Sequence, residues 1–318
     1  MWTPTYRKFK QTLMSMCRMT SPNGCEPYVW AHLPSPPFGG APGSSSRYCS
    51  GTTQIDRHGN YIVRIPGPGA RIMWTAHCDT ADSKPTLVNM KWRNDMLSTD
   101  GRSILGADDK VGCTIMAMMI RAGCPGTYSF FQGEEVGCLG SGAMSKEIAM
   151  LDYDACISLD RKGYDSAITR QRGSRCCSDA WAKDLCKAIW KESHEAIDLK
   201  VDPTGVFTDS AEFTNLIPEC TNLSVGYFAQ HTHAEKTDVA FAYSLCCALI
   251  RVAHKDLVPL PVRDIVNPSV DDDYDNDPWW NRYTHLGNGR YRFNASDTTP
   301  TDPDFMSEND WKDWKHAL

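Results

Sequence analysis

The sequence lacks the features that mark membrane-spanning, secreted and nucleic-acid-binding proteins. It has no unbroken apolar run of the roughly 18 residues that a membrane-spanning helix needs. Residues 1–18 intersperse Arg7, Lys8 and Lys10 among their apolar residues, so we expect no secretory signal. The net charge of −6 provides no electrostatic attraction for nucleic acid or for an acidic membrane. We therefore expect no nucleic-acid partner and no membrane association.

The 14 cysteines lack the spacing of a structural zinc knuckle, because no Cys-x-x-Cys pair occurs. Cys113, Cys246 and Cys247 fall in apolar helical patterns, and Cys78 and Cys156 fall in strand-like apolar runs. A free thiol in such a place packs as a small hydrophobe. Since disulfides persist in oxidising compartments, the pattern predicts a reduced protein in the cytoplasm.

Apolar segments of strand length alternate along the chain with segments of helical periodicity. We expect a hairpin over 54–65 and strands over 71–76, 128–132, 155–159 and 223–228. Helices are expected over 6–19, 111–120, 178–195 and 239–253. Residues 22–46 are rich in Pro, Gly and Ser and should be irregular. The alternation predicts an α/β fold, a three-layer sandwich with a mostly parallel central sheet.

Polar residues follow three of the predicted strands directly. His77 and Asp79 come after the first apolar run, Glu134 and Glu135 after the second, and Asp160 after the third. In open α/β sheets, sites lie at the carboxyl ends of the strands. The sequence therefore predicts that these side chains meet at one edge of the sheet.

The end of the chain differs in composition from the rest. From Asp264 to Leu318 there are 12 acidic and 5 basic residues, and Trp279, Trp280, Trp311 and Trp314 punctuate the segment. Two interpretations stay open: a solvated extension on the surface, or an arm that binds a partner or a second copy. We expect a main domain over residues 1–260 and an acidic, Trp-containing extension over 261–318.

Five segments supply potential metal ligands: 77–79, 106–110, 134–135, Asp160 and 231–233. Each one alone is a weak signal, since a Glu-Glu pair is usually solvated and an Asp-Asp pair often caps a helix. Taken together and in order, these segments resemble the clan of co-catalytic zinc peptidases, which includes tripeptidase T, bacterial leucyl aminopeptidases and glutamate carboxypeptidases. The motifs that carry the resemblance are AHCDT, LGADDKVG, FFQGEEVGCLGS, SLD and a late His. Two longer segments are especially similar to tripeptidase T, namely TDGRSILGADDKVG and NLSVGYFAQHTHAE. The resemblance covers roughly residues 52–257.

The resemblance implies two divalent ions that share a bridging carboxylate, about 3.5–4 Å apart. Asp108 matches the bridging position. His77 and Asp160 match the ligands of one ion, and Glu135 and His231 match the ligands of the other. A set of carboxylates and imidazoles suits zinc and also admits cobalt or manganese. We expect two Zn²⁺ ions, with Co²⁺ or Mn²⁺ as alternatives.

The resemblance also implies roles for residues that do not bind metal. Glu134 matches the general base, and Asp79 matches the carboxylate that orients the His77 imidazole. Asp109 should point away from the ions and cap the following helix. Cys78 should face the opposite side of its strand from His77.

Two assignments rest on weaker signals. His231 and His233 compete for one ligand position, and we favour His231 because Glu235 lies four residues after it. His233 would then contact substrate. Asp209 resembles a family segment near the substrate cleft, although it could also cap a short helix.

One departure from the family concerns length. Tripeptidase T and its relatives carry a separate lid domain between the Asp and His ligands. Here only 70 residues separate Asp160 from His231, and these already hold a predicted helix. An additional independent domain has no room there. We therefore expect a single catalytic domain without a lid, as in the leucyl-aminopeptidase branch.

These features predict a zinc-dependent metallopeptidase, an aminopeptidase that cuts short peptides. One alternative is a deacylase or carboxypeptidase acting on N-acyl amino acids, because the same metal core serves those amide bonds. Another is a non-catalytic binding protein on the same fold, against which the complete set of ligands and Glu134 argues. The oligomeric state stays open.

Overall fold

The computed structural model describes residues 2–34, 51–147, 152–265, 283–285 and 291–293. The chain divides into two units, Met1–Asp273 and Tyr274–Leu318. The second unit contributes the antiparallel pair β15 (Tyr283–His285) and β16 (Tyr291–Phe293). The four tail tryptophans, the acidic run at 271–275 and residues 35–46 of the predicted irregular segment lie outside the described residues. The boundary expected at residue 260 stays a prediction.

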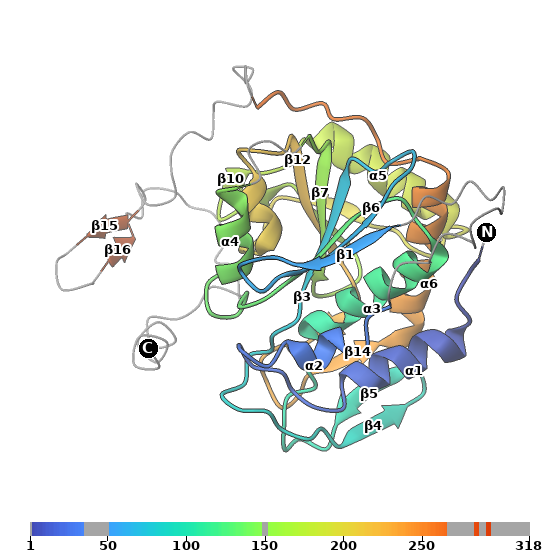
Figure 1. The fold of residues 1–318 in the computed structure, drawn as a ribbon, viewed down its shortest axis with the longest axis vertical. Coiled ribbons are helices and arrows are strands. Elements are labelled where there is room, and N and C mark those ends of the chain that lie inside the picture. Colours follow the sequence, from blue (N-terminus) through green and yellow to red (C-terminus); the bar gives the residue numbers. More distant parts are fainter. Residues whose placement is uncertain (1, 35–50, 148–151, 266–282, 286–290, 294–318) are drawn as a thin grey trace. The chain divides into compact units, whose positions relative to one another are not determined.

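An eight-stranded sheet runs through the first unit in the order β1-β2-β6-β3-β7-β12-β8-β11 (Figure 1). The four middle strands β6, β3, β7 and β12 are mutually parallel. β1, β2 and β6 are joined by antiparallel pairing, β8 touches β12 antiparallel, and β11 is parallel to β8. The bounds are β1 Thr52–Ile55, β2 Tyr61–Ile65, β3 Ile72–His77, β6 Gly126–Phe131, β7 Ala155–Arg161, β8 Ser166–Ile168, β11 Lys200–Asp202 and β12 Glu219–Ser224. The predicted α/β fold with a mostly parallel sheet is confirmed.

The middle strands are apolar because both of their faces are covered. Every residue of β3, β6 and β12 is buried, and Trp74 and Tyr128 are among the largest fully buried side chains. Strands that are buried on both faces read as continuous apolar runs rather than as alternating ones. This is why the sequence pattern located β3, β6 and β7, whereas it missed β12, whose sequence ECTNLS is largely polar.

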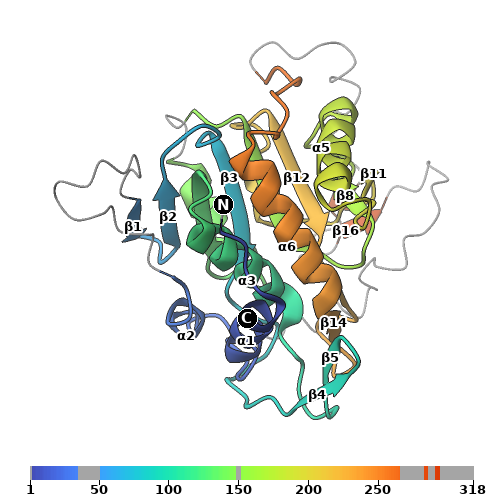
Figure 2. The ribbon, with the colours of Figure 1, turned by 90° about the vertical axis from the view of Figure 1, so that its right-hand side faces the viewer.

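Four long helices pack against the sheet and against one another. They are α1 (Tyr6–Met16), α3 (Ala107–Ala122), α5 (Asp179–Glu192) and α6 (Val239–His254). α3 contacts β3, β7 and α6, while α5 contacts α6 and β11 (Figure 2). Thr5, Ser178 and Asp238 cap α1, α5 and α6 by accepting backbone amides, which satisfies donors that a helix start leaves open.

Successive residues of β3 face different partners. The Cys78 sulfur, directly after β3, lies 3.9 Å from that of Cys113 on α3. Phe131, which pairs with His77 in the register of β3 and β6, stacks on Phe213 of the 3₁₀ helix η2 (Asp209–Phe213). η2 also contacts the short helix α4 (Leu139–Ser145). Cys78 therefore faces the α3 side as buried core, as predicted.

A second, four-stranded antiparallel sheet was not predicted. Its order is β13-β14-β5-β4, with β4 Met90–Arg93, β5 Met96–Thr99, β13 Tyr227–Phe228 and β14 Lys236–Asp238. The single strand expected over 223–228 is wrong, because β12 ends at Ser224 and β13 belongs to this second sheet. Gly226 makes the break at φ 92°, and a Cβ there would lie 2.7 Å from the Phe241 ring. The remaining short elements are α2 (Pro27–Trp30), β9 (Arg170–Gln171) and β10 (Ser174–Arg175).

No helix in the described part of the chain is long and apolar enough to cross a bilayer. The 13 cysteines that the structure describes are all free, and all but Cys25 are buried. Their thiols contribute to packing within the core, as the apolar context of their sequence predicted.

The chain beyond α6 is tied to the core as far as Arg263. The Trp181 indole donates to the Pro259 carbonyl at 2.8 Å, and the amides of Val262 and Arg263 donate to Glu219 at 2.9 Å.

We predict that truncation before Asp271 leaves the melting temperature within a few degrees of that of the full chain, because it spares these bonds. Truncation before Pro259 should lower it by roughly 5 °C or more, since buried Glu219 and Trp181 lose hydrogen-bond partners. Thermal unfolding of both truncations checks this, and a large fall on truncation before Asp271 would contradict it.

Candidate metal centre

The sheet topology brings residues from distant parts of the sequence to one edge. His77 is the last residue of β3, and Asp160 lies near the carboxyl end of β7, the parallel neighbour of β3. Glu135 follows β6, and Asp108 opens α3. His231 lies in the loop between β13 and β14 of the second sheet. His77, Glu135 and Asp160 thus lie at the carboxyl ends of neighbouring parallel strands, and Asp108 and His231 reach them from α3 and from the second sheet.

Two groups of potential ligand atoms lie within 4.8 Å of one another, and Asp108 belongs to both. One group is His77, Asp108 and Asp160, and the other is Asp108, Glu135 and His231. The Nε2 atom of His77 lies 3.0 Å from Asp108 Oδ1 and 3.6 Å from Asp160 Oδ1. The Nε2 atom of His231 lies 3.2 Å from Asp108 Oδ2 and 3.0 Å from Glu135 Oε1. Each oxygen of Asp108 thus faces a different imidazole.

The two groups differ in exposure. The side chain of His77 is 1% exposed, whereas that of His231 is 48% exposed. Asp108, Glu135 and Asp160 keep less than a tenth of their side-chain surface. The centre therefore has an enclosed half at the strand ends and an outer half that opens toward solvent beside the His231 loop.

Asp79 organises the backbone of the Glu-Glu pair. Its two carboxylate oxygens accept the amides of Glu134 and Glu135, each at 3.0 Å. The Nδ1 atom of His77 lies 3.0 Å from the Asp79 carbonyl oxygen and 3.5 Å from its carboxylate. The carbonyl is thus the nearer partner of the imidazole. The Asp79 carboxylate contributes mainly by holding the backbone amides of Glu134 and Glu135, which fixes the directions of these two side chains.

Glu134 and Glu135 occupy different surroundings despite being adjacent. Glu135 lies in one of the potential ligand groups, and Glu134 lies in neither group found among the described residues. The Cys138 thiol donates to Oε1 of Glu134, with the sulfur 3.8 Å from that oxygen. Burial, together with the charges of Asp160 and Glu135, raises the pKa of Glu134 well above its ordinary value. Glu134 is thus a partly buried carboxyl beside the centre and not within it.

The concentration of acidic groups dominates the electrostatics. Burial, and next the charge of Asp108, raises the pKa of Asp160. Burial opposes the charged form of His231, but the neighbouring carboxylates of Asp108 and Glu135 raise its pKa to about 11. Burial also opposes ionisation of Asp108, yet His231 and His77 hold its pKa below the ordinary value. Each imidazole thus stands where positive charge is favoured, as expected of a site for cations.

Asp160 is held by residues that sequence reasoning did not single out. The Thr208 hydroxyl donates to Asp160 Oδ2 at 2.5 Å, and the Tyr227 hydroxyl donates to Oδ1 at 3.0 Å. Asn222 accepts the Asp160 amide and donates to its carbonyl. Only the tertiary fold reveals these partners, because they follow Asp160 by about fifty residues or more in the sequence.

The structure also places Asp109, Asp209 and His233. Asp109 is fully buried and accepts the amides of Gly112 and His77, so its predicted role as a helix cap is confirmed. Asp209 opens η2 and is buried, and its Oδ1 atom has no hydrogen-bond partner among the described residues. His233 is absent from both ligand groups, and its carbonyl accepts the Thr99 hydroxyl at 3.4 Å.

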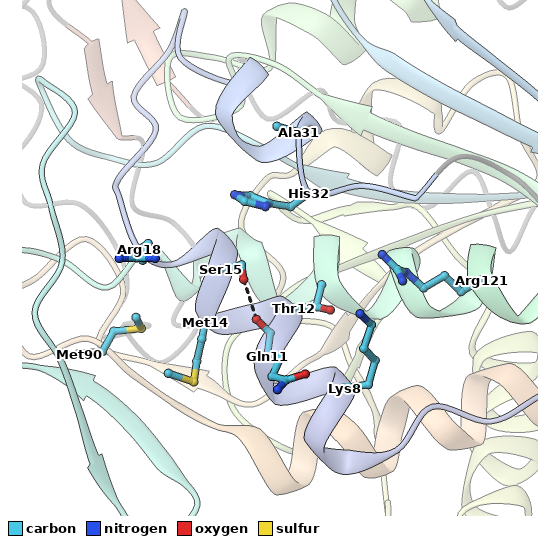
Figure 3. Close-up of a pocket in the computed structure, with 10 residues that line it drawn as sticks. All are labelled: Lys8, Gln11, Thr12, Met14, Ser15, Arg18, Ala31, His32, Met90 and Arg121. Carbon is cyan, nitrogen blue, oxygen red and sulfur yellow. Dashed lines mark hydrogen bonds between the residues drawn. The ribbon is translucent and has the colours of Figure 1, made fainter.

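A separate cavity of about 780 Å³ lies away from these residues, against α1, α2 and the end of α3 (Figure 3). Lys8, Arg18, His32 and Arg121 line it together with uncharged side chains. None of the residues of the two ligand groups contributes to its wall. Despite its volume, this cavity is not the candidate metal centre, because the acidic and imidazole groups that could bind a metal lie elsewhere.

Comparison with solved structures shows that this fold occurs in peptidases. Aminopeptidase PepT from Bacillus cereus is 14% identical at a TM-score of 0.60, over 79% of this chain and 98% of that one. A tripeptidase from Staphylococcus aureus is 13% identical at a TM-score of 0.62, over 80% and 100%. The LapA aminopeptidase from Legionella pneumophila is 15% identical at a TM-score of 0.55, over 80% and 73%. No protein-family model and no curated protein matches the sequence. The resemblance to co-catalytic metallopeptidases is confirmed at the level of the fold.

The shared position of Asp108 leads to a prediction about metal stoichiometry. Asp108→Ala should abolish binding of both ions, since its oxygens face both ligand groups and two cations without a bridging anion repel each other. His231→Ala should abolish binding of one ion. His233→Ala is the matched control and should bind as the wild type does. Elemental analysis after zinc reconstitution measures this, and saturation of the wild type at one ion would contradict it.

Proposed function

We propose that the chain is a two-metal hydrolase that cuts peptide bonds, an aminopeptidase acting on short peptides. The observation that carries the proposal is the placement of Asp108, whose two oxygens lie 3.0 Å and 3.2 Å from separate imidazoles. A carboxylate shared by two sets of ligands is the arrangement that a pair of divalent cations needs. The fold, which solved peptidases share, supports the same function.

The residues at the centre fit such cations. Glu135 Oε1 and His231 Nε2 are 3.0 Å apart, yet Oε1 is buried and has no hydrogen-bond partner among the described residues. A buried carboxylate oxygen without a hydrogen bond, next to an imidazole nitrogen, suits a cation that binds both atoms. The donors are carboxylate oxygens and imidazole nitrogens throughout, which suits Zn²⁺ and admits Co²⁺ or Mn²⁺.

Each ligand role follows from the two groups. His77 and Asp160 would hold one ion, Glu135 and His231 would hold the other, and Asp108 would serve both. Asp79 would fix the backbone of Glu134 and Glu135 by accepting their amides. When bound, the two ions would polarise the scissile carbonyl and bring the pKa of a water molecule down to about 7.

Glu134 would act as the general base. It lies beside the centre without being one of the ligands, and burial raises the pKa of its carboxyl. Such a group can accept a proton near neutral pH and release it again. Glu134 would take the proton from the attacking water and deliver it to the leaving amine nitrogen.

The open setting of the outer ligands supports a peptide with a free amino terminus as substrate. Between Asp160 and His231 the described chain supplies strands of both sheets, α5 and η2, within a single compact unit. We therefore retain the proposal of a three-layer catalytic domain without a lid. The buried free thiols support a reduced, cytoplasmic setting.

A substrate screen with the zinc-loaded protein tests the proposed function. We predict that short peptides with a free amino terminus are hydrolysed at least about tenfold faster, in kcat/KM, than their N-acetylated counterparts. The reverse preference would reassign the protein to deacylases or carboxypeptidases. A wild type that binds no metal would instead support a binding protein.

The distinct surroundings of Glu134 and Glu135 generate the next prediction. Glu134→Gln should keep both ions and the fold but lose at least about a hundredfold in kcat, because the proton shuttle is gone. Glu135→Gln should instead weaken binding of one ion, and added zinc should restore part of its activity. Metal content and turnover must be measured on both variants. Turnover close to that of the wild type in metal-loaded Glu134→Gln would remove the general-base assignment.

A further inference from the structure

Glu235 is a buried carboxylate that the proposed chemistry does not use. It is 1% exposed and lies at the end of the His231 loop, directly before β14. Its Oε2 atom accepts the amides of Leu105 and Gly106 at 2.7 Å and 2.8 Å, and its Oε1 atom accepts the amide of Asp108 at 3.0 Å. One side chain therefore binds three amides of the turn that presents Asp108.

The turn at residues 105–108 is shaped to receive an anion. Gly106 adopts φ 69°, in the left-handed region. A Cβ there would lie 2.9 Å from Thr80 Cγ2, so the position also requires glycine for space. Successive amides around such a residue converge on one point and form a concave site for an anion. The turn precedes the regular part of α3, where helix amides and the helix dipole further favour negative charge.

The backbone of Glu235 is anchored independently of this turn. β14 begins at the next residue and pairs with β5, with Lys236 opposite Ser98. The Glu235 amide donates to the Thr232 carbonyl, within the loop that carries His231. Glu235 thus connects the second sheet and the His231 loop with the turn that holds Asp108.

We propose that Glu235 is a positioning residue that sets the Asp108 carboxylate between the two ligand groups and fixes the His231 loop relative to it. The proposal rests on the proposed two-metal function. Because Asp108 faces both groups and His231 belongs to the outer one, loss of Glu235 should weaken both ions together. Partners that orient metal ligands typically change metal affinity by about 10–100-fold when mutated.

Glu235→Gln is the decisive variant. It keeps the size of the side chain but replaces one accepting oxygen with an amide group that can only donate. At least one of the three backbone amides then faces a donor and loses its partner. We expect the apparent zinc dissociation constants of both sites to rise at least about tenfold, measured by competition with a chelator. The visible spectrum of the cobalt-loaded protein should change as well.

Glu219→Gln provides a matched control. Glu219 is also fully buried, and it accepts the Ser178, Val262 and Arg263 amides at 2.7–2.9 Å. It opens β12, at the opposite end of the strand from the metal centre. This variant should lose stability in the same way but keep the wild-type zinc affinity and cobalt spectrum.

Equal zinc affinities in Glu235→Gln and Glu219→Gln, with two ions bound by the wild type, would overturn this inference and leave the proposed function intact. A wild type that binds no zinc would overturn both. If Glu235→Gln does not fold, Glu235→Asp replaces it, since it keeps the charge and shortens the reach by one methylene. Weakened binding of both ions in Glu235→Asp supports the positioning role, and wild-type affinity contradicts it.

Discussion

The carboxylate of Asp108 lies between two imidazoles, and the rest of the site is arranged around that placement. Asp160 and Glu135 stand on either side of it, and all three keep little contact with water. Several carboxylates cannot be ionised together in such a place without compensating positive charge. Two cations would provide this charge, and the two imidazoles are placed to share in binding them. The same concentration of charge would favour the binding of cations.

The scaffold divides this task between strands of the main sheet and a loop of the second sheet. The parallel strands β3 and β7 present His77 and Asp160 from the buried centre of the main sheet. His231 comes from a short loop of the second sheet and is half exposed. Two further carboxylates hold the backbone of the site by accepting amides. Asp79 accepts those of Glu134 and Glu135, and Glu235 accepts that of Asp108. Sites built on strands are precise, whereas a loop ligand needs such a support to keep its position.

Much of the fold could be predicted because its signals are local. The buried strands appear as short apolar runs, and α3 and α6 appear as long apolar stretches. The second sheet could not be predicted in this way. Its strands are two to four residues long and partly exposed, so they lack both a continuous run and a clear alternation. The apolar run through Gly226 concealed the point where the chain passes from one sheet to the other.

The sequence alone indicated which residues we propose for the chemistry, because its carboxylates and imidazoles follow apolar runs in an order that resembles the co-catalytic zinc peptidases. It also indicated that Cys78 would pack in the core, since consecutive residues of a strand face opposite sides. Tertiary structure decided the rest. It brought His231 rather than His233 to Asp108, placed Thr208 and Tyr227 on Asp160, and seated Glu235 in the turn before α3. These contacts join residues tens to more than a hundred positions apart, and no local pattern encodes them. Their physical cause is the pairing of strands and the burial of polar groups that must find partners.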